Sequence, residues 1–116
     1  MNYSIEQTDE YGRRLKRLVK KHRSLRKDLS DLYDTLERDP FQGVLIRPHV
    51  RKLRVAITSK GRGKSGGARV LTYLVIPKQD DDDEGKIYLL TIYDKGDIAA
   101  LTDDYIDDLI NEIDIE

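Results

Sequence analysis

The spacing of apolar residues predicts two amphipathic helices in the first 40 residues of the chain. Thr8 can cap the first helix, because its hydroxyl can accept from free backbone N–H groups of the first turn. Ser24 can cap the second, and Asp39 ends it because a residue before proline is disfavoured in the helical region. A short turn at residues 22–23 predicts an antiparallel helical hairpin. The apolar stripes are Tyr11, Leu15, Leu18 and Val19 in the first helix, and Leu25, Leu29, Leu32, Tyr33 and Leu36 in the second.

The middle of the chain has the pattern of β-strands. Residues 52–59 alternate between apolar and polar side chains, whereas residues 69–76 and 86–93 are nearly continuous β-branched and apolar runs, which are typical of buried strands. Residues 44–46 are expected to form a short edge strand. Residues 79–85, with four consecutive Asp, are expected to be a solvated turn.

A third helix is predicted at the C-terminus. Thr102 can cap it, and its apolar stripe is Tyr105, Ile106, Leu109, Ile110 and Ile113. This acidic helix could pack on the sheet, or lie beside the basic residues as an internal counter-charge. Helices followed by strands predict an α+β fold in a single domain, residues 1–116: an N-terminal helical hairpin packed on a mostly antiparallel sheet of three or four strands, with a C-terminal helix. The other sheet face would stay free to present residues.

The formal charge of −1 conceals a strong asymmetry along the chain. Residues 1–78 carry 19 Lys and Arg against 8 Asp and Glu, whereas residues 79–116 carry 2 against 14. Residues 40–79 contain nine Lys and Arg and no acid at all. Such a basic patch indicates binding of a polyanion. The alternative is that the two halves neutralise each other across the fold.

Several classes of chemistry are excluded by the residues that the chain lacks. Without Cys there is no disulfide, thiolate nucleophile or Cys-ligated zinc, and the two His, at 22 and 49, are far apart in the sequence. We therefore expect no metal and no cofactor. No segment has the pattern of a signal peptide or a membrane span, so a cytoplasmic protein without a membrane partner is expected.

The basic window contains a glycine-rich run, Ser-Lys-Gly-Arg-Gly-Lys-Ser-Gly-Gly-Ala-Arg, at residues 59–69. It is not a nucleotide P-loop, because Thr58 stands where that motif needs glycine and a strand follows instead of a helix. A hairpin loop between two strands is expected; the alternative is a solvated loop without function. Its cations could fix phosphates and stabilise the charge of a transition state. A Lys among like charges has a lowered pKa and could transfer protons, and a Tyr could stack on a base.

These features together resemble a known protein family. The resemblance follows chain order from roughly residue 10 to residue 112: the helical hairpin, the strand Arg-Lys-Leu-Arg-Val-Ala at 51–56, the loop Lys-Gly-Arg-Gly-Lys-Ser-Gly-Gly at 60–67, the strand start Ala-Arg-Val at 68–70, and Leu-Leu-Thr-Ile-Tyr-Asp-Lys at 89–95. The chain is similar to the RelE/ParE toxin superfamily, and most similar to its RelE/HigB-type branch. Gly96 is a departure, since relatives often carry a small polar residue there.

The resemblance implies the toxin of a type II toxin–antitoxin system. Such a toxin is a ribosome-dependent mRNA endonuclease, which cuts mRNA in the ribosomal A site without a metal, contacts rRNA, and is neutralised by a cognate antitoxin protein. The alternatives are a ParE-like gyrase inhibitor, a catalytically degenerate module that binds RNA or antitoxin, and a plain interaction module; the dense basic set favours the ribonuclease.

The resemblance also implies site residues. The catalytic candidates are Arg54, Lys60, Lys64, Arg69, Tyr93 and Lys95, and the RNA-binding candidates are Arg51, Lys52 and Arg62. Arg69 is the first choice for phosphate contact, and Lys60 and Lys64 are candidates for proton transfer. Tyr93 fits a core role equally well, and Arg54 and Arg69 could instead be surface charges.

Overall fold

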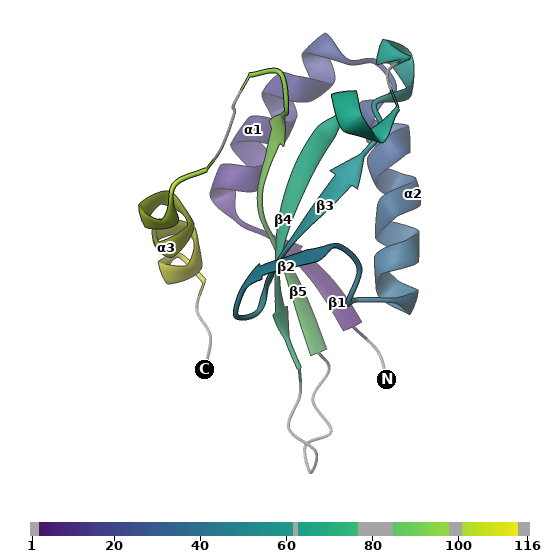
Figure 1. Ribbon diagram of the computed structural model, residues 1–116. Coiled ribbons are helices and arrows are strands. Elements are labelled where there is room, and N and C mark those ends of the chain that lie inside the picture. The colour runs from purple at the N-terminus through teal and green to yellow at the C-terminus, as the bar shows by residue number, and fades with distance from the viewer. Residues whose placement is uncertain (1–2, 62, 77–84, 98–100, 114–116) are drawn as a thin grey trace.

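A computed structural model describes residues 3–61, 63–76, 85–97 and 101–113. It has an α+β fold with three helices and one five-stranded sheet (Figure 1). In chain order the elements are β1 (Tyr3–Gln7), α1 (Asp9–Lys21), α2 (Leu25–Arg38), β2 (Val44–Arg47), β3 (Val50–Val55), 3₁₀ turns at Thr58–Lys60 and Lys64–Gly66, β4 (Ala68–Val75), β5 (Gly85–Asp94) and α3 (Asp103–Asn111). The predicted α+β class is confirmed, but the strand predicted at residues 52–59 ends at Val55 and a 3₁₀ turn follows it at Thr58–Lys60.

The sheet has the order β1-β5-β4-β3-β2, so the expected count of three or four strands is wrong. The unexpected strand is β1, which pairs in parallel with the first half of β5, whereas the other three pairings are antiparallel. Strand β1 is short, and its partner lies at the other end of the chain. No local pattern could therefore reveal the pairing. As expected, β2 is an edge strand and β4 is central.

Helices α1 and α2 cover one face of the sheet. The hydroxyl of Thr8 accepts from the backbone N–H of Tyr11 at 3.1 Å, as a capping residue should. Ser24 stands at the start of α2 but makes no cap bond, because its hydroxyl donates to Asp28 at 2.8 Å. The core between these helices and the sheet includes the buried residues Tyr11, Leu18, Leu25, Leu29, Leu36, Leu53, Val55, Val70, Leu74, Ile87 and Ile92.

Helix α3 packs on the opposite face, so the expectation that this face stays free is wrong for much of its area. Ile106 and Leu109 form a second core there with residues of β3, β4 and β5, namely Val50, Leu71, Tyr88 and Leu90. Figure 1 shows α3 and α2 on opposite sides of the sheet. The sequence pattern gave α3 an apolar stripe, and the strands offer it an apolar surface because both their faces carry large side chains.

The connection from β3 to β4 is a long hairpin loop followed by a strand, as the sequence predicts. Gly61 and Gly63 have φ of 70° and 65°, which favours glycine. At Gly67 a Cβ would lie 2.0 Å from the carbonyl oxygen of Val55, so the backbones of loop and strand approach too closely for any side chain. Residues 79–84 of the predicted Asp-rich turn lie outside the described residues.

Two buried threonines make a matched pair for measuring the cost of an unsatisfied hydroxyl. The Thr72 hydroxyl has no hydrogen-bond partner among the described residues, whereas the Thr91 hydroxyl lies 3.0 Å from that of Tyr105. We expect Thr72→Val to raise the free energy of unfolding by about 1 kcal/mol and Thr91→Val to lower it by a similar amount. Urea unfolding of both variants measures this, and equal decreases in stability would show that Thr72 is satisfied.

Candidate functional site

Three of the predicted catalytic residues form a row across the sheet. In the strand register, Arg54 of β3 lies opposite Arg69 of β4, and Arg69 lies opposite Tyr93 of β5. Residues directly opposite on antiparallel strands share a face, with Cβ atoms about 4.5–5.5 Å apart. Arg69 and Leu71 share a face too, so the row lies on the α3 side of the sheet, beyond the second core. We call Arg54, Arg69 and Tyr93 the cross-strand row.

The members of the cross-strand row differ in exposure. Arg54 is exposed, whereas Arg69 and Tyr93 are only 4% and 6% exposed. The guanidinium of Arg69 donates to the carbonyl oxygens of Lys64, at 2.9 Å, and Ala68, at 3.2 Å. Arg69 is therefore no surface charge, and it fastens the glycine-rich loop to the sheet. Burial raises the pKa of Tyr93, although the charge of Arg69 acts in the opposite direction, so the phenol is protonated at neutral pH.

The other end of the loop is fixed by a buried carboxylate that sequence reasoning missed. Asp94, the last residue of β5, accepts from Lys60 Nζ at 3.0 and 3.2 Å and from the backbone N–H of Gly96 at 3.0 Å. His22, at the end of α1, places Nε2 3.1 Å from the same carboxylate. We call His22, Lys60 and Asp94 the carboxylate cluster. The only sequence signal was Asp94 inside the block 89–95, one of those that carry the sequence resemblance, since His22 and Lys60 lie on unrelated segments.

The carboxylate cluster keeps Asp94 charged. Burial works to raise the pKa of Asp94, but the N–H of Gly96 and the ammonium of Lys60 outweigh it and hold that pKa below its usual range. Asp94 is thus ionised at neutral pH. Lys60 donates to both its oxygens, which favours a role for Lys60 as a fixed ammonium over a role as a proton acceptor.

A groove of about 740 Å³ lies between α2 and β3, and Arg54 is the member of the cross-strand row that lines it. The predicted site residues Lys52, Arg54 and Lys64 line it. Asp28 also lines it, but this carboxylate is occupied by the N–H and hydroxyl of Thr58, at 2.9 and 2.6 Å. These bonds, with that of Ser24, outweigh burial and lower the pKa of Asp28. The groove therefore combines three cations with two carboxylates, of which Asp28 serves the loop and the exposed Asp31 pairs with Lys27.

The remaining predicted site residues do not all lie on the face of the cross-strand row. Lys95 is exposed at the end of β5, and its backbone N–H donates to Gly67 at the base of the loop at 3.2 Å. Lys52 lies on the face of the cross-strand row, since it is opposite Leu71. Arg51 alternates with Lys52 and stacks on Phe41, 5.0 Å from the ring, so the structure does not bring it to the row. Arg62 lies outside the described residues.

Comparison with known protein families found no family model that matches the chain. Within the described ranges, no three His, Asp or Glu side chains are grouped so that they could hold a metal ion. No helix in this part of the chain is long and apolar enough to cross a membrane. The arrangement of cations and tyrosine is therefore the basis for inferring a function.

The carboxylate cluster should make stability depend on pH. Because the folded pKa of Asp94 is lowered, its stabilisation is fully present above the unfolded pKa of about 3.9 and is lost as pH falls toward the folded value. We expect Asp94→Asn to lower the free energy of unfolding by about 1–3 kcal/mol at pH 7, with a smaller difference from the wild type below about pH 4. Urea unfolding at several pH values measures both.

Asp31→Asn is the matched control, since Asp31 is an exposed carboxylate in a surface pair with Lys27. It should change the free energy of unfolding by less than about 0.5 kcal/mol. Equal effects of the two substitutions at pH 7 would contradict the role assigned to Asp94.

Proposed function

We propose that this chain is the toxin of a type II toxin–antitoxin system and acts as a ribosome-dependent mRNA endonuclease. The observation that carries the proposal is the cross-strand row, in which two arginines and a tyrosine adjoin a loop that presents further cations. The sequence resemblance to the RelE/HigB-type branch supplies the substrate class. Its partners would be mRNA in the ribosomal A site, rRNA and a cognate antitoxin in the cytoplasm.

The proposed reaction is a phosphoryl transfer within the RNA. The 2′-hydroxyl attacks the adjacent phosphorus and gives up its proton while the bond from phosphorus to the 5′-oxygen breaks. That oxygen takes up a proton, and the products are a 2′,3′-cyclic phosphate and a 5′-hydroxyl. The transition state gathers extra negative charge on the non-bridging oxygens, so fixed cations accelerate the step.

The geometry suggests distinct parts for the candidate residues. Arg54 is exposed on the cross-strand row and can donate to the non-bridging oxygens, and Lys64 lines the same groove as Arg54. Arg69, held beneath the loop, acts as a positioning residue and adds positive charge behind the site. Tyr93, whose pKa is raised by burial, is a protonated phenol and suits a donor to the leaving oxygen better than a base.

Expression in a bacterium tests the proposal. We expect the wild type to stop growth and to produce mRNA 5′ ends within translated codons. Arg54→Ala should lower the cleavage rate by about a hundredfold, because an exposed cation that stabilises the transition state is lost. Mapping of mRNA 5′ ends against reading frames measures this.

Arg38→Ala is the matched control, because Arg38 is also an exposed arginine but ends α2, away from the cross-strand row. It should cleave like the wild type. Arg69→Ala is a poorer first test, since it also releases the loop. Growth arrest with intact mRNA would overturn the proposal in favour of a gyrase inhibitor. No arrest and no cleavage would favour a binding module.

A further inference from the structure

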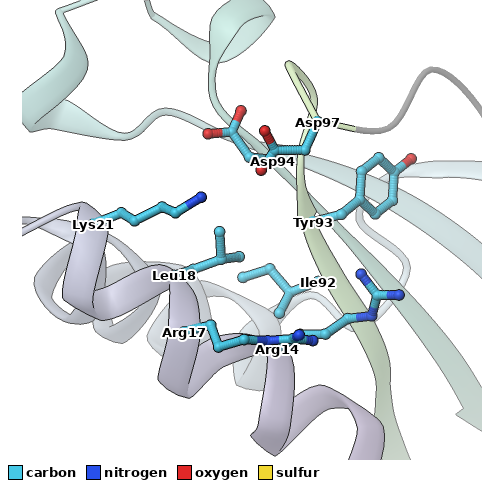
Figure 2. A pocket seen from close by; sticks show the side chains of 8 residues that line it. All are labelled: Arg14, Arg17, Leu18, Lys21, Ile92, Tyr93, Asp94 and Asp97. Carbon is cyan, nitrogen blue, oxygen red and sulfur yellow. The ribbon is translucent and has the colours of Figure 1, made fainter.

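A second cationic pocket lies on the other side of β5, between that strand and α1. It has a volume of about 300 Å³ and is lined by Arg14, Arg17, Leu18, Lys21, Ile92, Tyr93, Asp94 and Asp97 (Figure 2). We call it the α1 pocket. Strand β1 pairs only with Gly85–Leu89, so the second half of β5 has no strand on this side and α1 runs along it instead.

The three cations of the α1 pocket come from one face of α1. Arg14, Arg17 and Lys21 are spaced by three and four residues, which puts them on neighbouring turns. Figure 2 shows all three rising from the helix on the side of β5. One donor of the Arg14 guanidinium is already occupied, since its Nε donates to Glu10 at 3.1 Å. Arg17 and Lys21 are exposed and make no hydrogen bond or ion pair within the described part of the chain.

One of the two carboxylates of the α1 pocket is already compensated. Asp94 is engaged by Lys60 and His22 in the carboxylate cluster, so its charge is already compensated. Asp97 is exposed. Two cations that no ion pair engages within the described residues thus face an opening with a floor of Leu18 and Ile92, which are 7% and 0% exposed. Arg and Lys side chains so placed are suited to a phosphate group.

We propose that the α1 pocket binds a phosphate group of a single-stranded RNA whose neighbouring nucleotides lie on the cross-strand row. Tyr93 belongs to both the row and the pocket, so one strand can pass from one to the other around the end of β5. This inference rests on the proposed function for the nature of the ligand. It adds a second point of attachment, with Arg17 and Lys21 as binding residues that take no part in bond breaking.

Helix α1 also contains the residues for a matched control substitution. Lys16 and Lys20 are also exposed cations of α1 with the same spacing as Arg17 and Lys21, but they do not line the pocket. Arg17→Ala/Lys21→Ala and Lys16→Ala/Lys20→Ala each remove two positive charges and keep the rest of α1. Both pairs should retain the wild-type circular dichroism and melting temperature, because alanine favours helix.

Binding is measured by fluorescence anisotropy with a labelled, unstructured RNA of about twelve nucleotides, which is long enough for a single-strand site. We expect the pocket pair to weaken binding about tenfold or more and the control pair less than about threefold. The slope of log affinity against log salt should become shallower by about 0.7 for each phosphate that the variant no longer neutralises.

Equal weakening by the two pairs would overturn the inference, because it would indicate only the general charge of α1. Absence of RNA binding by the wild type would overturn it as well. Neither result depends on mRNA cleavage in cells by the wild type, which tests the proposed function separately. Failure of the pocket and failure of the nuclease are therefore distinguishable.

Discussion

The buried carboxylate of Asp94 joins the three segments on which the candidate site depends. Through Lys60 it holds the glycine-rich loop, through His22 it holds the turn between α1 and α2, and it is itself the end of β5. A buried ion pair is costly unless its remaining donors and acceptors are satisfied. Here the backbone N–H of Gly96 supplies a further bond, so the charge is well compensated. Figure 1 shows the result, with the loop beside the α1–α2 turn.

Fixing the loop determines which cations remain for a ligand. Lys60 donates to the carboxylate of Asp94, and Arg69 donates to the carbonyl oxygens of Lys64 and Ala68. These two sets of bonds hold the loop at both of its 3₁₀ turns. Arg54 and Lys64, which are both exposed, line the groove at the edge of this rigid frame. Such a frame matters for phosphate chemistry, because donors that are already oriented need no reorganisation as charge develops.

The sequence predicted elements that depend on local patterns and missed those that depend on distant partners. Thr8 and Thr102 cap their helices because capping is decided within one turn. Strand β1 escaped because its pairing depends on a strand far along the chain, and the pattern left open whether α3 packs on the sheet, as it does, or lies beside the basic residues. The same holds for the site. Alternation along β3 placed Lys52 and Arg54 on one face, but the carboxylate cluster unites segments that no spacing connects.

The two halves of the chain carry opposite charges, but only some cations of the basic half pair with the acidic half. If the acidic half simply neutralised the basic window, its cations would be paired across the fold. Arg47 does pair with Asp107 of α3, and Lys60 pairs with Asp94. Within the described residues, however, no ion pair engages Lys52, Arg54 or Lys64, which line the groove between α2 and β3. Internal pairing therefore serves the frame of the molecule, whereas the cations at the groove stay outside any ion pair among the described residues. Asp28 and Asp31 line the same groove, but their carboxylates are held by Thr58 and by Lys27. The three cations are therefore not paired with them, and their mutual repulsion opposes the compact state.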